Sequence, residues 1–326
     1  MKSFLKFVSI FILIILVLTT GLGIYIYSQF QPVNTKDTSV TQFVIPKGQA
    51  VSVIASRLKT ENLIKNALAF RVLVKYQQLE SQIQAGSFEL TRSMSVKEIA
   101  TSLTQGTNDL WVTIPEGWRV EEIAQMLTKQ GLSEFDSDEF IALAKSEEGY
   151  LFPDTYLIPK LATHETIYQL LRNTFDKKIT QGLSEEIAAS KQSLTENLIM
   201  ASIVEREARG DEQMRQVAGI LWHRIDIGMA LQTDATLQYA KGYSQTEKSW
   251  WTTPTSADRS VASPFNTYLN PGLPPRPICN PGLSAIKAVL DPAATTNLFY
   301  LHDRTGEIHY AATLEEHDSN IEKYLR

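Results

Sequence analysis

The chain has 326 residues, of which 43% are hydrophobic and 21% charged, and its formal net charge is −5. This length points to about two domains, and the hydrophobic fraction excludes a largely disordered chain. The charged fraction excludes a polytopic membrane protein, and the mild acidity argues against a nucleic-acid partner, which normally requires a basic face.

An apolar segment comes first. No charged residue occurs between Phe7 and Tyr27, and roughly 20 apolar residues match the hydrocarbon thickness of a bilayer. Lys2 and Lys6 precede it, which predicts a cytoplasmic N-terminus and an extracytoplasmic remainder. A cleaved signal peptide is the alternative, but the run is long for one and no small-x-small site follows it. We therefore expect residues 1–30 to be a single-pass anchor in the cell (inner) membrane.

A polar linker, residues 31–42, and a repeated motif follow the apolar segment. Phe43-Val-Ile-Pro-Lys-Gly48 and Val112-Thr-Ile-Pro-Glu-Gly117 each precede apolar residues at helical spacing, which predicts strand–helix units packed together. A strand that enters a helix and is followed by a second strand resembles LysM-type glycan-binding modules. Residues 43–135 are therefore interpreted as a LysM-like module, either a saccharide-binding platform or a spacer. The candidates for stacking on sugar are Trp111 and Trp118.

The segment Thr195–Ala208 lacks Gly and Pro and predicts a helix with its first residue as N-cap. At about 100° per residue, its aliphatic side chains form one arc, from which Glu207 projects, while Glu205 falls on another side. Burial of an unpaired carboxyl raises its pKa and keeps it protonated near neutral pH, as a general acid requires. The alternative is a structural salt bridge from Glu207 to Arg215 or Arg224.

Several polar motifs occur later in the predicted domain, residues 136–326. A second helix is predicted over Asp211–Ile227, and Leu231-Gln-Thr-Asp234 then offers Thr233 or Asp234 as an N-cap. Asn266-Thr-Tyr268 combines amide, hydroxyl and aromatic groups, the mixture that holds a sugar. Near the C-terminus, the segments 298–301 and 308–311 predict a hairpin. The fold class expected from these elements is α+β.

Five segments together resemble the endolytic murein transglycosylases of the YceG-like family. They are Gly149-Tyr-Leu-Phe-Pro-Asp-Thr-Tyr156, Ala201-Ser-Ile-Val-Glu-Arg-Glu207, Leu231-Gln-Thr-Asp234, Asn266-Thr-Tyr268 with Gly272-Leu-Pro-Pro275, and Glu316-His317. The resemblance implies a membrane-anchored lytic transglycosylase that cuts the β-1,4 MurNAc–GlcNAc bond within peptidoglycan strands, leaves 1,6-anhydroMurNAc ends and limits nascent strand length. Its implied partners are glycan strands and the cell-wall synthesis and division machinery. The family's catalytic glutamate aligns with Glu207, and Glu205 is the fallback.

A hydrolytic glycosidase needs two carboxyls, about 5 Å or about 7–9 Å apart. Glu205 and Glu207 cannot both face one cleft, because two helical residues are separated by about 200°. A lytic mechanism needs one carboxyl, which donates a proton to the glycosidic oxygen and then takes one from the muramyl C6 hydroxyl. The residues expected to orient the sugars are Gln232, Thr233, Asp234, Asn266, Thr267 and Tyr268.

Two other functions are weighed against the lytic reaction. One is a hydrolytic muramidase with Asp234 as its second carboxylate, and the other is a non-catalytic peptidoglycan-binding scaffold in which Glu207 is merely paired. No cofactor or metal is expected, because the histidines are scattered along the sequence and no phosphate loop or dinucleotide fingerprint occurs.

Overall fold

The computed structural model describes residues 2–46, 48–105 and 109–326, with side chains of the first helix from Ile15 onward. The chain folds into two compact units, Met1–Trp111 and Val112–Arg326. Among the residues described, helices are combined with three separate two-stranded sheets, so the α+β class is confirmed.

The first unit begins with α1 (Lys2–Ser28), which contains the predicted anchor. Residues 7–14 of the predicted apolar span lie outside the residues whose side chains are described. Within the described part of the chain, no helix is sufficiently long and apolar to cross a bilayer.

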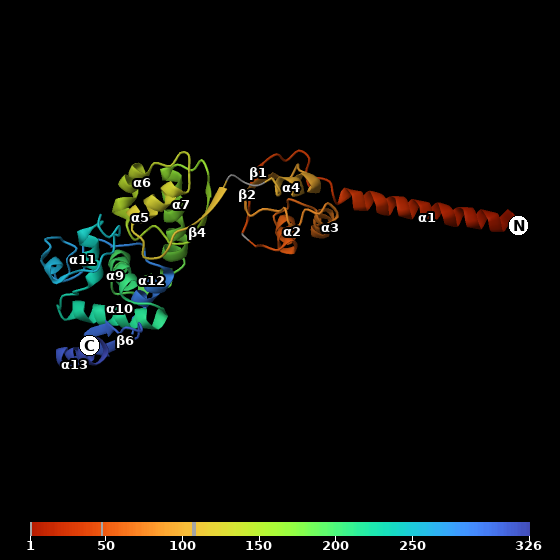
Figure 1. Cartoon of the computed structure of the whole chain (residues 1–326). Helices are drawn as coiled ribbons and strands as arrows, with labels where there is room; N and C mark the ends of the chain where they lie inside the picture. The colour runs from red at the N-terminus through yellow and green to blue at the C-terminus, as the bar shows by residue number, and fades with distance from the viewer. Residues whose placement is uncertain (1, 47, 106–108) are drawn as a thin grey trace. The chain divides into compact units, whose positions relative to one another are not determined.

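The repeated motif forms the strand–helix arrangement that its sequence predicts. In the first unit, β1 (Val40–Ile45) pairs antiparallel with β2 (Gly86–Thr91), with Phe43 opposite Phe88. The helices are α2 (Val51–Thr60), α3 (Ala67–Tyr76) and α4 (Val96–Ser102). The strands and helices bury a common core that includes Phe43, Leu58, Phe70, Leu90 and Ile99. The two strands with the helices between them follow the order strand–helix–helix–strand (Figure 1).

The second unit contains most of the helices. They are α5 (Val120–Lys129), α6 (Ser137–Ala144), α7 (His164–Phe175), α8 (Ser184–Ala189), α9 (Leu194–Glu207), α10 (Asp211–Asp226), α11 (Asp234–Lys241), α12 (Leu283–Leu290) and α13 (Leu314–Tyr324). Short helical turns occur at η1 (Lys145–Glu147), η2 (Asp176–Gln181) and η3 (Ser256–Ser260). β3 (Asp109–Thr113) pairs with β4 (Thr155–Pro159). The predicted hairpin is confirmed as β5 (Phe299–His302) and β6 (Ile308–Ala311), paired antiparallel.

The compact units divide at 111/112, whereas the sequence suggested 135/136. The division lies earlier because the second copy of the repeat packs with later parts of the chain. Helix α5 packs against α6, and the backbones of Trp118 and Asn280 bond to each other, N to O at 2.9 Å, in an isolated antiparallel bridge.

Helix α9 is the central helix of the second unit, and it packs against α10 and α12 (Figure 1). Every residue from Asn197 to Val204 is buried, so the helix is covered all round and not along one arc as predicted. Its N-cap is Ser193 and not Thr195. The Ser193 and Glu196 side chains each bond to the other residue's backbone N–H, which forms a capping box.

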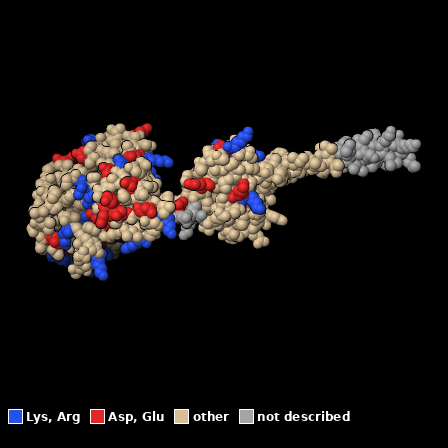
Figure 2. All heavy atoms as spheres, turned by 90° about the horizontal axis from the view of Figure 1, so that it is seen from above, with Lys and Arg blue, Asp and Glu red and all other residues tan. Residues whose placement is uncertain are grey.

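Charged side chains are interspersed on the surface of this unit. On the face shown in Figure 2, acidic side chains gather near the centre, with basic ones around them. On this face, acidic and basic side chains are mixed, and the basic ones do not form one continuous patch.

Candidate active site

The last residues of α9 line a cavity of about 800 Å³. Glu205, Arg206 and Glu207 form one wall, and the start of α10 and the β5–β6 turn, His302 to Gly306, form others. Because the core surrounds α9 on all sides, the helix holds the carboxyls at its end in defined positions.

Glu207 is partly buried and makes one side-chain hydrogen bond, which the Tyr300 hydroxyl donates at 3.0 Å. Burial raises the pKa of Glu207, and the nearby Asp234 carboxylate adds to this rise. The Tyr300 hydroxyl, the Ala235 backbone and the Arg224 charge act in the opposite direction. Burial thus favours the protonated form, which a general acid must adopt.

The two cations considered as salt-bridge partners of Glu207 are engaged elsewhere. Arg215 pairs with the Asp291 carboxylate at 3.0 Å. Arg224 donates from Nε to the Leu298 carbonyl at 2.7 Å and from Nη1 to the Leu231 carbonyl. These contacts account for both guanidinium groups without a direct ion pair to Glu207.

Glu205 lies in a different setting. Its Oε2 accepts a hydrogen bond from the Gly282 backbone N–H at 2.9 Å. Burial, assisted by the negative charge of Glu116, raises the pKa of Glu205 to about 7, against the opposing effects of the Gly282 N–H and the Arg206 charge. Helical spacing predicted that Glu205 and Glu207 could not face one cleft, and this is wrong, because both line the same cavity at the end of α9. Within it they bond to different parts of the chain, Glu205 to Gly282 and Glu207 to Tyr300.

Glu116 is a residue of this cavity that the sequence did not single out. Its carboxyl lies where a Cβ on Gly282 would stand, so the residue at position 282 must lack a side chain for this contact to form. The signal that could have found Glu116 is the Pro-Glu-Gly motif of the repeat, in which a glutamate at a turn stands beside a glycine of positive φ, Gly117.

Three of the predicted sugar-orienting residues lie inside the protein. Thr233, Asn266 and Thr267 are at most 2% exposed. The Asn266 side-chain amide donates to the carbonyls of Arg259 and Val261, and the Thr233 and Thr267 hydroxyls lie 3.4 Å apart. Their contacts hold the loops together, which differs from the direct sugar contact that the sequence suggested.

The other three predicted residues, Gln232, Asp234 and Tyr268, reach the surface. The Tyr268 hydroxyl donates to Asp234 at 2.8 Å. Asp234 is near enough to Glu207 to influence its pKa but is not among the residues that line the 800 Å³ cavity. The structure thus brings Asp234 and Tyr268 together beside the candidate acid.

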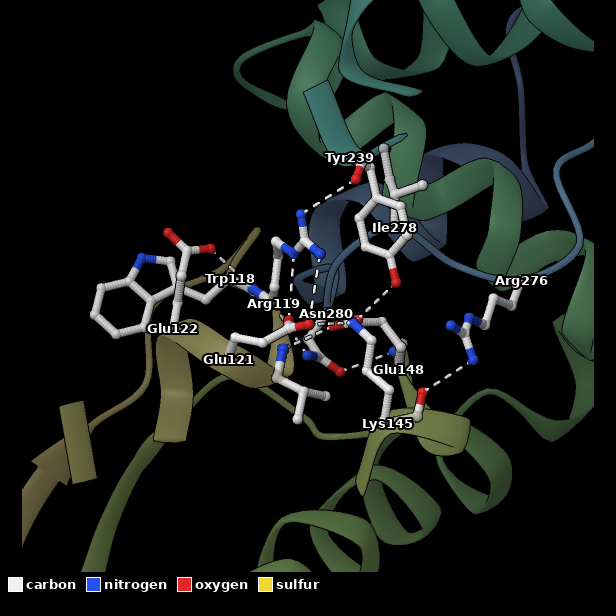
Figure 3. A network of polar contacts seen from close by, with 12 residues as sticks. Trp118, Arg119, Glu121, Glu122, Lys145, Glu148, Tyr239, Arg276, Ile278 and Asn280 are labelled. Carbon is white, nitrogen blue, oxygen red and sulfur yellow. Dashed lines mark hydrogen bonds and ion pairs between the residues drawn. The ribbon is translucent and has the colours of Figure 1, made fainter. Parts of the chain in front are cut away.

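A network of polar contacts, drawn in Figure 3, includes the buried side chains of Glu148 and Asn280. Glu148 is fully buried and accepts from the Val120 N–H at 2.8 Å, from Lys145 at 2.8 Å and from the Tyr239 hydroxyl at 3.1 Å. Asn280, also fully buried, accepts from the N–H groups of residues 149 and 151. These bonds fix the segment that ends at Gly282, the donor to Glu205.

Two of the five histidines, His302 and His309, lie in the β5–β6 hairpin. His302 lines the cavity. His309 lies 3.1 Å from the Asp303 carboxylate, and Asp303, Glu307 and His309 could together offer three ligand atoms to a cation. The Asp303 carboxyl already accepts hydrogen bonds from the backbone N–H groups of Thr305 and Glu307. These bonds stabilise the hairpin turn, and this structural role accounts for the position of Asp303 without a cation.

Comparison with known proteins identifies the family. A family model described as the YceG-like family matches residues 43–323, and the chain belongs to this family. It is 32% identical to the endolytic murein transglycosylase of Bacillus subtilis (strain 168), over 94% of this chain and 90% of that protein. It is 28% identical to the endolytic murein transglycosylase of Streptococcus pneumoniae serotype 2, over 92% of this chain and 61% of that protein.

A solved structure is similar as well. The crystal structure of a yceG-like protein from Listeria monocytogenes matches with a TM-score of 0.55 and 30% sequence identity. The match covers 86% of this chain and 99% of that one.

Proposed function

We propose that this chain is an endolytic murein transglycosylase, an enzyme that cleaves the β-1,4 MurNAc–GlcNAc bond within peptidoglycan strands. The observation that carries the proposal is Glu207, a desolvated carboxyl held by Tyr300 at the wall of the cavity. The names of the relatives support the substrate and the reaction class.

Glu207 acts as acid and base in turn. In its protonated form it donates to the glycosidic oxygen, and the bond from that oxygen to the muramyl anomeric carbon breaks while positive charge develops on the sugar. The muramyl O6 then attacks the anomeric carbon, and the Glu207 carboxylate takes the O6 proton. The products are a 1,6-anhydroMurNAc end and a free hydroxyl on the other fragment, with no water consumed.

A single carboxyl suits the observed geometry. Both glutamates line the cavity, but Glu205 is bonded to the Gly282 backbone, whereas Glu207 is held by the Tyr300 hydroxyl beside Asp234. A hydrolytic muramidase, the alternative, would require Asp234 as second carboxylate, with water leaving a reducing sugar end. A non-catalytic scaffold is the other alternative, and it would bind sacculi without cutting them.

The cellular setting is proposed from the sequence. Residues 1–30 anchor the chain in the cell membrane with the N-terminus in the cytoplasm, and the enzyme works outside, where it limits the length of nascent strands beside the synthesis and division machinery. The strand–helix–helix–strand order of the first unit supports the interpretation of this part as LysM-like, as a spacer or as a glycan-binding platform.

The experiment that tests the proposed function is digestion of purified sacculi by the full chain in detergent, followed by mass analysis of the released fragments. We expect 1,6-anhydroMurNAc termini. Reducing termini would establish the muramidase, and bound sacculi without released fragments would establish the scaffold.

A further inference from the structure

A second hollow opens on the Val112–Arg326 unit, lined by α5 and by the segment 243–250. Its volume is about 500 Å³, and it is lined by the aromatic side chains of Trp118, Tyr243 and Trp250 and by polar ones such as Gln125 and Lys129. An overlapping hollow of about 670 Å³ shares four of these residues. We call this combined feature the aromatic groove.

The aromatic rings of the groove are held in fixed positions. Tyr243 and Trp250 pack with their ring centroids 5.1 Å apart, and the Arg119 guanidinium lies 4.5 Å from the Trp250 ring. The Trp118 backbone is bonded to Asn280, while the Trp118 indole projects away from the buried Glu148 network (Figure 3). Rings already ordered before binding lose little conformational freedom when a ligand arrives.

Two chains of contacts join the groove to the active-site cavity. The first is covalent: Glu116 lines the cavity, and Trp118, two residues further on, lines the groove. The second runs through side chains. Arg206, in the cavity wall, lies 3.9 Å from the Trp251 ring, and the Trp251 indole N–H donates to Glu122 of the groove at 2.8 Å.

The composition of the groove fits one class of ligand. A pyranose ring offers apolar C–H faces, which pack on aromatic rings, and a rim of hydroxyl and acetamido groups, which bond to amides and to ammonium groups. Gln125 and Lys129 supply such polar groups next to Trp118, Tyr243 and Trp250.

We infer that the aromatic groove binds sugars of the same glycan strand that is cut at Glu207, at subsites remote from the scissile bond. This inference rests on the proposed function. Cleavage inside a strand requires sugar units on both sides of the cut, and binding energy from remote units can be used to position the reacting bond. The groove thereby selects long strands over short ones.

The test uses the full chain carrying Glu207→Gln, so that binding is measured without cleavage. The probes are chitohexaose and chitobiose, peptide-free GlcNAc oligomers, and affinity is measured by calorimetry. We expect added Trp118→Ala or Tyr243→Ala to weaken chitohexaose binding about tenfold. Chitobiose is too short to span the active-site cavity and the aromatic groove, so the same substitutions should weaken its binding less than that of chitohexaose.

The matched control is Tyr168→Ala, on α7, which should leave chitohexaose binding unchanged; Tyr168 is partly exposed, as Trp118 and Tyr243 are. Circular dichroism verifies folding, and Tyr243→Ala decides the outcome if Trp118→Ala does not fold. Unchanged chitohexaose affinity in the folded groove variants would overturn the inference even if the wild-type chain releases anhydro fragments. A loss of affinity in a chain that releases none would instead refute the proposed function and leave the groove as a saccharide site.

Discussion

Glu205 and Glu207 show how strongly the surroundings of a residue decide its chemistry. Both are glutamates at the end of one helix, yet one bonds to a backbone N–H at Gly282 and the other to a phenol at Tyr300. Burial raises the pKa of each. Only Glu207 lies near Asp234, which itself bonds to Tyr268, and this neighbourhood favours Glu207 as the residue that meets the sugar.

Glu207→Gln should lower the release of anhydro fragments from sacculi by at least about 100-fold, because an amide cannot donate and retrieve the proton. Stability should change little, since the carbonyl of the introduced amide still accepts from the Tyr300 hydroxyl. Fragment release is measured by chromatography with mass detection. Glu205→Gln, at the fallback residue on the same helix, is measured beside it and should reduce release far less if Glu207 is the acid. Full activity in Glu207→Gln would remove this residue from the proposed role.

Glu205 should make stability depend on pH. Its pKa is about 7 in the folded chain against 4.5 ordinarily. Between these values the folded state binds more protons than the unfolded one, so this group lowers the free energy of unfolding as pH rises through the window. The Glu205→Gln variant has no titrating group at this position, so it does not lose this stability as the pH rises.

The stability of Glu205→Gln relative to wild type should therefore increase between pH 4.5 and about pH 8, by up to about 3 kcal/mol. Urea unfolding at a series of pH values measures it. Parallel pH dependence in the two proteins would show that Glu205 titrates normally in the folded chain.

At the scale of elements, α9 determines where the acid stands. The helix begins at the Ser193 capping box and is buried from Asn197 to Val204, so both its start and its axis are fixed before it reaches Glu207. A shift of the helix start or of the helix axis would move the Glu207 carboxyl away from the Tyr300 hydroxyl.

Ser193→Ala should lower the free energy of unfolding by about 1 kcal/mol, because the Glu196 N–H loses its acceptor at the helix start. Thr195→Ala is the neighbouring control. Thr195 makes only an exposed contact with the Tyr150 hydroxyl, so we expect a smaller loss. Chemical denaturation of both variants compares them directly, and an equal or greater loss from Thr195→Ala would contradict the observed cap.

At the scale of the whole molecule, the buried network of Figure 3 joins segments far apart in the Val112–Arg326 unit. Glu148 contacts Val120 and Tyr239, and Asn280 contacts the backbone at residues 118, 149 and 151. These bonds thereby fix the positions of the segments that carry Glu116 and Gly282 relative to each other.

Glu148→Ala should destabilise the chain by about 3 kcal/mol, because it leaves Lys145, the Val120 N–H and the Tyr239 hydroxyl with fewer partners in a dry site. Glu147→Ala is the adjacent control. Glu147 is 35% exposed in its pair with Arg172, so its loss should cost less than about 1 kcal/mol. Urea midpoints of the two variants provide the measurement, and similar midpoints would argue against a stabilising network.

Local sequence was sufficient to predict several of the elements and to single out Glu207 as the candidate acid. The predicted elements include the strand before and the helix after each Pro-x-Gly motif, the helix that carries Glu207, and the β5–β6 hairpin. These elements depend on contacts between residues a few positions apart, which show in the sequence as periodicity and turn residues. The order of the motifs also indicated the family. The sequence did not predict the burial of Thr233, Asn266 and Thr267. A polar residue in a sequence pattern looks identical whether its side chain binds a ligand or bonds to another loop.

The surroundings of the acid, by contrast, come from packing between distant segments. Tyr300 lies 93 positions from Glu207, and Gly282 lies 77 positions from Glu205. Glu116 and the aromatic groove depend on the same kind of distant packing. Local sequence determines whether a segment forms a helix, a strand or a turn. Which segments pack against one another depends on how side chains from the whole unit are buried together, and no short sequence pattern contains that information.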